Sequence, residues 1–528
     1  MPRVLAPLCV MLLLLIPGIA RTDAVTLRWA GHGDINTTDP HSQNESLTNN
    51  VNSLVYEFLV TRDRNMKIVP ALATSWSQVN ATTWRFTLRP GVHFHDGTPF
   101  TADDVVFSFE RAKAPSSQLR AYARQTGVAR KIDALTVEFS TPGPNPAMLE
   151  HVITINIMSR AWCLGNHAMT PQDFTSNEDM VTTWQANGTG PYMLVSRQPD
   201  VKTVLRKNPD WWGIRDGRFE GNVDEVDYLP IVSDAKRVAA LVSGEVDVVN
   251  DLPPQDVPRL ARTPGIRVLE GVENRVVFIG MDQKRDELLY SSVKGRNPFK
   301  DRRVREALYR AIDIDAIRRT TMRGLARPTG AISPGAEMTT PEIEARLPFD
   351  RAAARKLLAD AGYPKGFDVT LDCPNNRYVN DRKVCEALAA MWSQVGVATR
   401  VNAMPRAVYF PKLARTDTSL YMLGWGGAAT DAIFVLQPVL SSYNGKGDGD
   451  FNYGRYTNAR IDALTARIKV DMDATERLDL IHQAFLAQNA EINLLPLYRQ
   501  VIPWATRANV SVVHRPDNWV IPMWASVK

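Results

Sequence analysis

The alternation of hydrophobic and polar residues predicts short strands followed by helices. Residues 84–89 (Trp-Arg-Phe-Thr-Leu-Arg) alternate apolar and polar side chains, which is the period of a half-buried strand, and residues 90–91 (Pro-Gly) end the run. Thr101 has the character of a helix N-cap, because acidic residues that favour the helix dipole and a set of apolar residues follow it. This part of the chain therefore predicts a strand, a turn and a helix in close succession.

Helical periodicity is most evident in the second half of the chain. Strand-like runs at 368–371 and 399–403 lie among the helical segments. Helices that alternate with strands are typical of layered α/β folds, so an α/β fold is predicted. The helical period is found in the segments 302–317, 352–361, 381–395, 459–468 and 475–490.

The composition is that of an ordinary globular protein. The chain has 528 residues, 44% hydrophobic and 23% charged, and its 62 Lys and Arg against 57 Asp and Glu leave a net charge of +5. These values exclude collagen-like, coiled-coil and wholly disordered classes. Basic residues alternate with acidic ones, as in residues 300–306, so a nucleic-acid binder that relies on a basic face is not expected. At about 150 residues per domain, the length predicts three or four domains.

The N-terminus has the pattern of a secretory signal peptide. Arg3 precedes an apolar run at residues 4–16, and small residues follow, so cleavage after Ala20 or Ala24 is expected. The run is too short to span a bilayer comfortably, and no other stretch approaches about 18 uninterrupted apolar residues. The sequence therefore predicts an exported, periplasmic protein without a membrane anchor.

Three cysteines remain once the predicted signal peptide is removed. Cys373 ends a strand-like run and Cys385 lies early in a helical pattern that begins near Asn380, so a short link between strand and helix could bring them together. Because an exported chain meets an oxidising compartment, we expect a Cys373–Cys385 disulfide, the alternative being two unpaired buried thiols. Cys163 is then the odd cysteine, and it is expected to be inert.

Catalytic and metal-binding motifs are missing. The sequence has no His-Glu-x-x-His, no phosphate-binding Gly-x-x-x-x-Gly-Lys-Ser/Thr, no Gly-x-Ser-x-Gly and no Cys-x-x-Cys. His93 and His95 share a face of a predicted strand, but no third metal ligand is close in sequence. No metal, cofactor or enzymatic activity is therefore predicted. His32, in the loop after a short apolar strand predicted at residues 25–30, is kept as a candidate ligand-binding residue.

Aromatic residues beside glycines indicate a pocket for a small organic ligand. Residues 423–428 read Leu-Gly-Trp-Gly-Gly-Ala, and the glycines around Trp425 leave the backbone open to a close approach. Aromatic walls with a few polar groups are typical of such pockets, so Trp425, Gly426 and Tyr409 are predicted to contact a ligand. The alternative for any single aromatic ring is a place in the hydrophobic core.

Residues 84–105 (Trp-Arg-Phe-Thr-Leu-Arg-Pro-Gly-Val-His-Phe-His-Asp-Gly-Thr-Pro-Phe-Thr-Ala-Asp-Asp-Val) resemble the signature segment of the family 5 extracellular solute-binding proteins. Members of this family are periplasmic receptors of ABC importers for dipeptides, oligopeptides and nickel chelates. Further segments that resemble the family lie at 188–192, 207–212, 241–247, 304–308 and 361–364.

The resemblance implies a periplasmic-binding-protein clamshell with two lobes built from three domains and a hinge between the lobes. Ligand would bind between the lobes and favour the closed state, and the importer would recognise this closed state. A monomer that delivers ligand to inner-membrane permease subunits is expected. The implied boundaries are 1–24 for the signal peptide, 25–56 with 186–275 and 491–528 for domain I, 57–185 for domain II inserted in it, and 276–490 for domain III.

The resemblance also bears on the ligand. Peptide-binding relatives hold the ligand's amino group with an Asp three residues after the pocket Trp, and here that position is Ala428. Asp431 could substitute, although it matches a different acid in the family pattern. Residues 373–377 resemble the segment in which dipeptide receptors place the Arg that binds the ligand's carboxylate, so Arg377 is predicted to make a bidentate pair with an acid.

These observations favour a non-enzymatic import receptor for a peptide or a peptide-sized organic acid, such as an opine-like or sugar-acid conjugate. A metal-chelate carrier or a chemosensory receptor on the same fold is the alternative. An exported hydrolase is a weaker alternative, because no nucleophile and base can be nominated.

Overall fold

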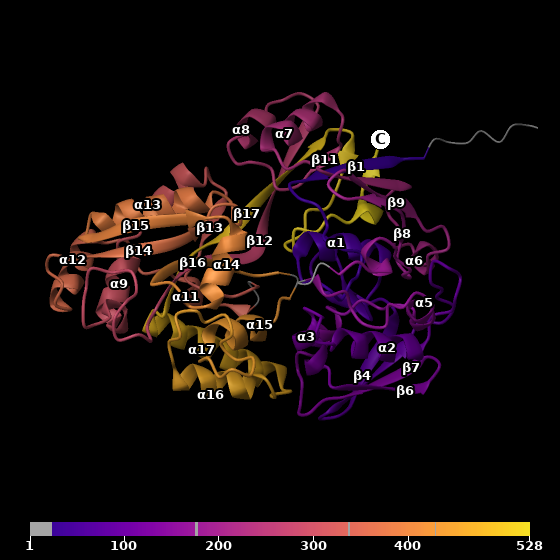
Figure 1. Ribbon diagram of the computed structural model, residues 1–528, viewed down its shortest axis with the longest axis horizontal. Coiled ribbons are helices and arrows are strands. Elements are labelled where there is room, and N and C mark those ends of the chain that lie inside the picture. The colour runs from indigo at the N-terminus through magenta and orange to yellow at the C-terminus, as the bar shows by residue number, and fades with distance from the viewer. Residues whose placement is uncertain (1–23, 175–177, 336–337, 428) are drawn as a thin grey trace, which may run out of the picture.

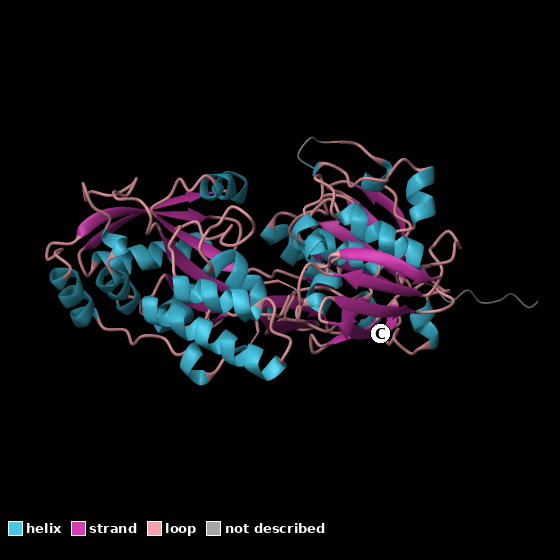
Figure 2. Ribbon diagram, turned by 90° about the horizontal axis from the view of Figure 1, so that it is seen from below, coloured by secondary structure: helices cyan, strands magenta, loops and turns pink. Residues whose placement is uncertain are grey.

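The computed structural model describes residues 24–174, 178–335, 338–427 and 429–528. It shows two lobes joined by long strands, which Figures 1 and 2 present from two directions. Residues 1–23 of the predicted signal peptide lie outside the described residues, and so does Ala428.

A large mixed sheet runs through both lobes, in the order β15-β14-β16-β12-β17-β11-β1-β10-β9-β8, with β13 paired to β17. Its strands are β1 (Thr26–Gly31), β8 (Tyr192–Gln198), β9 (Lys202–Lys207), β10 (Glu225–Pro230), β11 (Val248–Val249), β12 (Ile266–Met281), β13 (Ala326–Pro328), β14 (Phe367–Pro374), β15 (Val397–Met404), β16 (Leu420–Trp425) and β17 (Leu494–Arg507). The strand-like runs at 368–371 and 399–403 are confirmed as β14 and β15.

The antiparallel pair β12 and β17 connects the lobes. Ile266 to Val272 pairs with the C-terminal part of β17, and Val276 to Gly280 pairs with its N-terminal part. The register shifts between Val272 and Val276, where residues 273–275 interrupt the ladder. Such an irregularity bends a strand locally. We call residues 24–272 and 501–528 lobe 1, residues 276–499 lobe 2, and residues 273–275 with Gln500 the hinge.

A second, antiparallel sheet lies in lobe 1, within the predicted insertion 57–185, in the order β4-β5-β7-β6. The predicted strand at 84–89 is confirmed as β5, and Thr101 caps α2 (Ala102–Ala112) in a reciprocal capping box with Asp104. Strands of the smaller sheets are β2 (Val60–Arg62), β3 (Ile68–Pro70), β4 (Ala73–Asn80), β5 (Thr83–Leu88), β6 (Val128–Asp133), β7 (Thr136–Ser140), β18 (Val510–Ser511) and β19 (Ser526–Val527).

Helices cover the sheets of both lobes (Figure 1). Besides α2, those of lobe 1 are α1 (Ser46–Val55), α3 (Arg120–Gln125), α4 (Met148–Val152), α5 (Arg160–Gly165), α6 (Trp212–Arg215), α7 (Asp234–Ser243) and α8 (Val257–Leu260). Those of lobe 2 are α9 (Arg302–Arg310), α10 (Ile314–Ala316), α11 (Pro341–Glu344), α12 (Arg351–Asp360), α13 (Asp381–Ser393), α14 (Arg406–Ala414), α15 (Ile433–Val435), α16 (Ala459–Ile468) and α17 (Ala474–Glu491). In the described part of the chain, no helix is long and apolar enough to cross a membrane.

The predicted helices are confirmed with one correction. A single helix over 302–317 is wrong, because α9 ends at Arg310 and α10 begins at Ile314. Between them, Asp313 leaves the helical conformation and its side chain accepts a hydrogen bond from the amide of Ala316. Such a local cap competes with the helix ladder and starts a new helix.

Candidate functional site

A cavity of about 1520 Å³ lies between the lobes, and residues of both lobes line it. Small-molecule pockets usually enclose roughly 300–1,000 Å³, so this cavity has room for a ligand larger than a single amino acid. Its wall is rich in aromatic side chains. They are Phe58, Tyr122, Phe174 and Trp519 from lobe 1, and Tyr378, Phe410, Trp425, Phe434, Phe451 and Tyr453 from lobe 2.

Trp425 and Gly426, at the end of β16, line the cavity. The indole Nε1 of Trp425 donates to the carbonyl of Phe434 at 2.6 Å, and its ring centroid lies 4.6 Å from that of Phe451. Gly426 packs against the hinge backbone so closely that a Cβ there would lie 2.4 Å from Cα of Arg275. Glycine is therefore required at this position by the close approach of β16 and β12.

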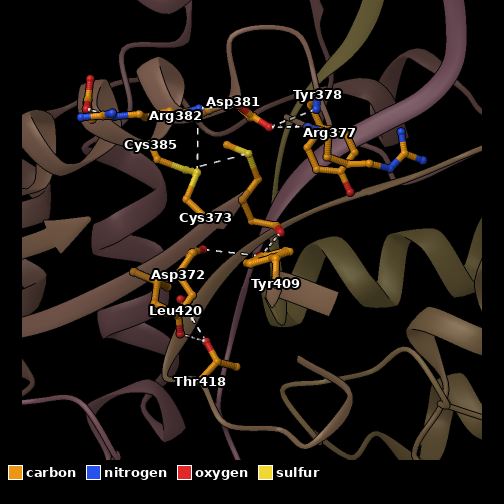
Figure 3. Close-up of a disulfide and its surroundings, with 12 residues drawn as sticks. Asp372, Cys373, Arg377, Tyr378, Asp381, Arg382, Cys385, Tyr409, Thr418 and Leu420 are labelled. Carbon is orange, nitrogen blue, oxygen red and sulfur yellow. Dashed lines mark hydrogen bonds and ion pairs between the residues drawn. A yellow bond between two sulfur atoms is a disulfide. The ribbon is translucent and has the colours of Figure 1, made fainter. Parts of the chain in front are cut away.

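Arg377 lies in the loop between β14 and α13, and this loop is closed by the Cys373–Cys385 disulfide (Figure 3). The backbone amides of Arg377 and Tyr378 donate to the Asp381 carboxylate at 2.9 and 3.1 Å, which fixes the loop. The Arg377 side chain lines the cavity, and its guanidinium has no hydrogen-bond or ion-pair partner among the described residues. It can therefore offer a fork of donors to a ligand.

A second guanidinium, that of Arg275, lies in the hinge and also lines the cavity. Its Nε lies 3.1 Å from both carboxylate oxygens of Glu273, and Gln500 donates to Glu273 at 3.1 Å. Gln500 in turn accepts from the amide of Val379, which ties the Arg377 loop to both crossing strands. The pKa of Arg377 is lowered, first by the charge of Arg275 and then by burial. An anion at this end of the cavity would relieve the repulsion.

Arg275 is not among the residues predicted from the sequence to contact a ligand. One signal was present, because the Glu273-Asn274-Arg275 segment places an acid and a base directly before the apolar run at residues 276–281. Charged residues that are buried beside such a run need partners and therefore mark a special position.

Acids near the hinge end of the cavity are engaged. Asp517 lines the cavity and is paired with buried Arg515, whose Nε lies 3.1 Å from its carboxylate. Glu273 is paired with Arg275. Farther along the wall, Asp450 is exposed in a glycine-rich loop and has no hydrogen-bond or ion-pair partner in the described ranges.

Other residues named from the sequence lie away from the described cavity wall. Both carboxylate oxygens of Asp431 are held by Arg477 at 2.7 Å. Tyr409 is fully buried in lobe 2 and its hydroxyl donates to the carbonyl of Met422. His32 is half-exposed in lobe 1, 3.3 Å from the Asp251 carboxylate, which raises the histidine's pKa.

Cys163 is buried and unpaired, and burial raises the pKa of its thiol to about 12, so it is unreactive at neutral pH. His95 is half-buried, with its Nε2 3.0 Å from the carbonyl of Gly190. Within the parts of the chain that the structure describes, no group of three or more His, Cys, Asp or Glu is placed to hold a metal ion.

Comparison with known proteins gives a consistent picture. The family model described as bacterial extracellular solute-binding proteins, family 5 Middle, matches residues 67–447. The glutathione-binding protein GsiB of Salmonella paratyphi A is 27% identical over 480 residues, which cover 89% of this chain and 87% of the relative.

Two solved structures share the fold. DppA of Helicobacter pylori, in complex with the peptide STSA, has a TM-score of 0.77 at 21% identity, over 94% of this chain and 97% of that one. AgaA of A. tumefaciens R10, in complex with agropinic acid, has a TM-score of 0.76 at 22% identity, over 95% and 99% of the two chains.

Proposed function

The chain belongs to family 5 of the bacterial extracellular solute-binding proteins, and we propose that it captures a peptide or a peptide-sized organic acid in the cavity between its lobes. The loaded, closed protein then delivers this ligand to the permease of an ABC importer. Binding needs no covalent step. Buried surface and a few charge-assisted hydrogen bonds supply the recognition.

The observation that carries the choice of an acid is the unpaired guanidinium of Arg377 in the cavity wall. A planar guanidinium binds a carboxylate through parallel hydrogen bonds, and the pair is strong when water is excluded. Among the charged residues that line this end of the cavity, Arg275 is balanced by Glu273 and Asp517 by Arg515, so the Arg377 guanidinium is left without a partner. One ligand carboxylate neutralises that charge.

The ligand's amine is expected to be absent, acylated or far from the acid. Of the acids near Arg377, Glu273 and Asp517 have arginine partners and Asp381 accepts backbone amides, and position 428 is alanine where peptide-binding relatives have an aspartate. A buried ammonium beside Arg377 would lack a partner. Asp450, farther along the wall, is available to an amine at the other end of a longer ligand. Glutathione, which GsiB is named for, carries its α-amine beside a second carboxylate in a γ-glutamyl residue, and both are remote from the glycine carboxylate.

Isothermal calorimetry with a matched panel tests the proposal. The panel contains Ala-Ala, N-acetyl-Ala-Ala and the C-terminal amide of each, together with reduced glutathione. We expect acids to bind and amides to fail, and N-acetyl-Ala-Ala to bind at least as well as Ala-Ala. Arg377→Ala should weaken binding by about 2 kcal/mol or more, because the carboxylate would be buried without its partner.

Arg382→Ala is the matched control. Arg382 lies five residues away in the sequence, and its guanidinium pairs with Glu386 on the surface. The control should bind as wild type does. Amides that bind as tightly as acids, or an Arg377→Ala variant that binds normally, would contradict an acid-binding site.

A further inference from the structure

The lobes meet at a polar contact beside the cavity. The Glu150 carboxylate, on α4 of lobe 1, accepts hydrogen bonds from the amide and the hydroxyl of Thr430 in lobe 2, each at 3.2 Å. Behind it, the buried guanidinium of Arg62 lies 2.6 Å from the same carboxylate and fixes its position. Neither Glu150 nor Thr430 belongs to the described cavity wall. Their contact therefore joins the lobes without needing to touch a ligand.

An aromatic contact between the lobes lies close to this polar one. Phe434, on α15 of lobe 2, stacks on Tyr122 of lobe 1 with ring centroids 5.7 Å apart and an interplanar angle of 20°. The ring centroid of His151, next to Glu150 in α4 of lobe 1, also lies 5.2 Å from that of Phe434. Figure 1 shows α3, which carries Tyr122, and α15 facing each other across the gap between the lobes. Offset aromatic pairs of this kind add to the burial of their surfaces.

The contact is connected to the ligand cavity through Trp425. Its indole donates to the carbonyl of Phe434 at 2.6 Å, so the residue that packs on lobe 1 also positions the aromatic wall of the cavity. Opening the lobes would separate Phe434 from Tyr122 and His151. The Phe434 carbonyl, which accepts the hydrogen bond from Trp425, could then move. A ligand that packs against Trp425 favours the arrangement in which Phe434 is docked.

We propose that Glu150, Thr430 and Phe434 form a latch that holds the lobes closed and sets ligand affinity through the closing equilibrium. Glu150 and Thr430 are positioning residues in this scheme, because they act without belonging to the cavity wall. If a ligand binds only the closed state, its affinity falls by the same factor as the closed population. The effect on affinity rests on the proposed function, whereas the effect on closure does not.

Thr430→Val is the sharpest test of the latch. It keeps the shape and the backbone amide of the residue but removes the hydroxyl that donates to Glu150. Hydrogen bonds to charged groups usually contribute enough to change an equilibrium about tenfold or more. We therefore expect the ratio of closed to open molecules to fall about tenfold. Thr430→Ser keeps the hydroxyl and is the matched control, and its ratio should stay within about twofold of wild type.

Closure is measured without ligand, by the distance between spin labels on the two lobes. Val128→Cys on lobe 1 and Val470→Cys on lobe 2 give attachment points, because both side chains are exposed, whereas Cys163 is buried. Wild type and Thr430→Ser should show a closed population that Thr430→Val largely loses. The melting temperature should not change, which separates a latch from a role in folding. A wild-type distribution without the closed species, or one that Thr430→Val leaves unaltered, would overturn the latch.

Calorimetry with reduced glutathione then links closure to affinity. The loss of affinity in Thr430→Val should equal the loss of closed population measured by the spin labels. If wild type binds no compound of the acid panel, the proposed function fails, and the ligand-free distances still decide the latch. If wild type binds glutathione and Thr430→Val binds it equally well despite a smaller closed population, the latch does not set ligand affinity.

Discussion

Lowering the pH should weaken ligand binding, because the His151 ring becomes protonated when the lobes open. In the closed structure this ring is buried against Phe434, and burial lowers its pKa from about 6.5 to about 4. The groups around it are the Asn145 amide, 3.4 Å from its Nδ1, and the paired charges of Asp431 and Arg477, which act in opposite directions. Separation of the lobes exposes the ring, so its pKa should return to the ordinary value.

The sign follows from proton linkage. The open state binds a proton below about pH 6.5, and the closed state does so only below about pH 4, so the closed state loses stability as the pH falls between these values. With these two pKa values and 1.36 kcal/mol per pKa unit, closure costs about 1 kcal/mol more at pH 6 and about 2 kcal/mol more at pH 5 than at neutral pH. The dissociation constant should therefore rise about 4-fold at pH 6 and about 30-fold at pH 5, relative to neutral pH.

Calorimetry with reduced glutathione at pH 7.5, 6 and 5 measures this directly. His151→Phe keeps an aromatic ring against Phe434 and removes the titrating group, so its affinity should depend much less on pH. Wild-type affinity that is constant from pH 7.5 to 5 would refute the reasoning. If His151→Phe loses as much affinity at low pH as wild type does, another group causes the effect.

Three further variants test the supporting structure. Arg477→Ala leaves the Asp431 carboxylate buried without its partner, so urea unfolding should show a loss of about 3–5 kcal/mol, and a loss under 1 kcal/mol would contradict a buried ion pair. Replacing Cys373 and Cys385 together by serine should lower the free energy of unfolding by about 2–3 kcal/mol, as expected for a short loop; unchanged stability would argue against the disulfide. Gly426→Ala should cost about 1–3 kcal/mol and weaken binding, because its Cβ meets β12 backbone; a neutral effect in both assays would show that the strands can separate freely.

Local patterns predicted much of this structure. The capping box at Thr101, strands β5, β14 and β15, and most helices follow from periodicity and capping over a few residues. The family and the clamshell fold, which were predicted by resemblance at residues 84–105 and elsewhere, are confirmed. The break between α9 and α10 was missed, because the apolar spacing continues across Asp313 although its side chain starts a new helix.

The site was predicted less completely, since it depends on contacts between distant parts of the chain. Trp425 carries a local signal in its glycine neighbours, but Glu150 meets Thr430 across 280 positions and nothing near either residue indicates the other. Asp431 resembles a possible ligand acid in the sequence, and only the fold shows that Arg477, 46 positions away, holds it. These pairings depend on how the lobes close, which periodicity does not encode.

Native mass spectrometry of the gently purified protein tests the central claim most directly. The proposed function predicts a retained compound of peptide size that carries a carboxylic acid, is identified after denaturation, and is lost from Arg377→Ala purified in parallel with Arg382→Ala. A retained compound without an acid group, or an acid that the Arg377→Ala protein keeps at the wild-type level, would contradict it.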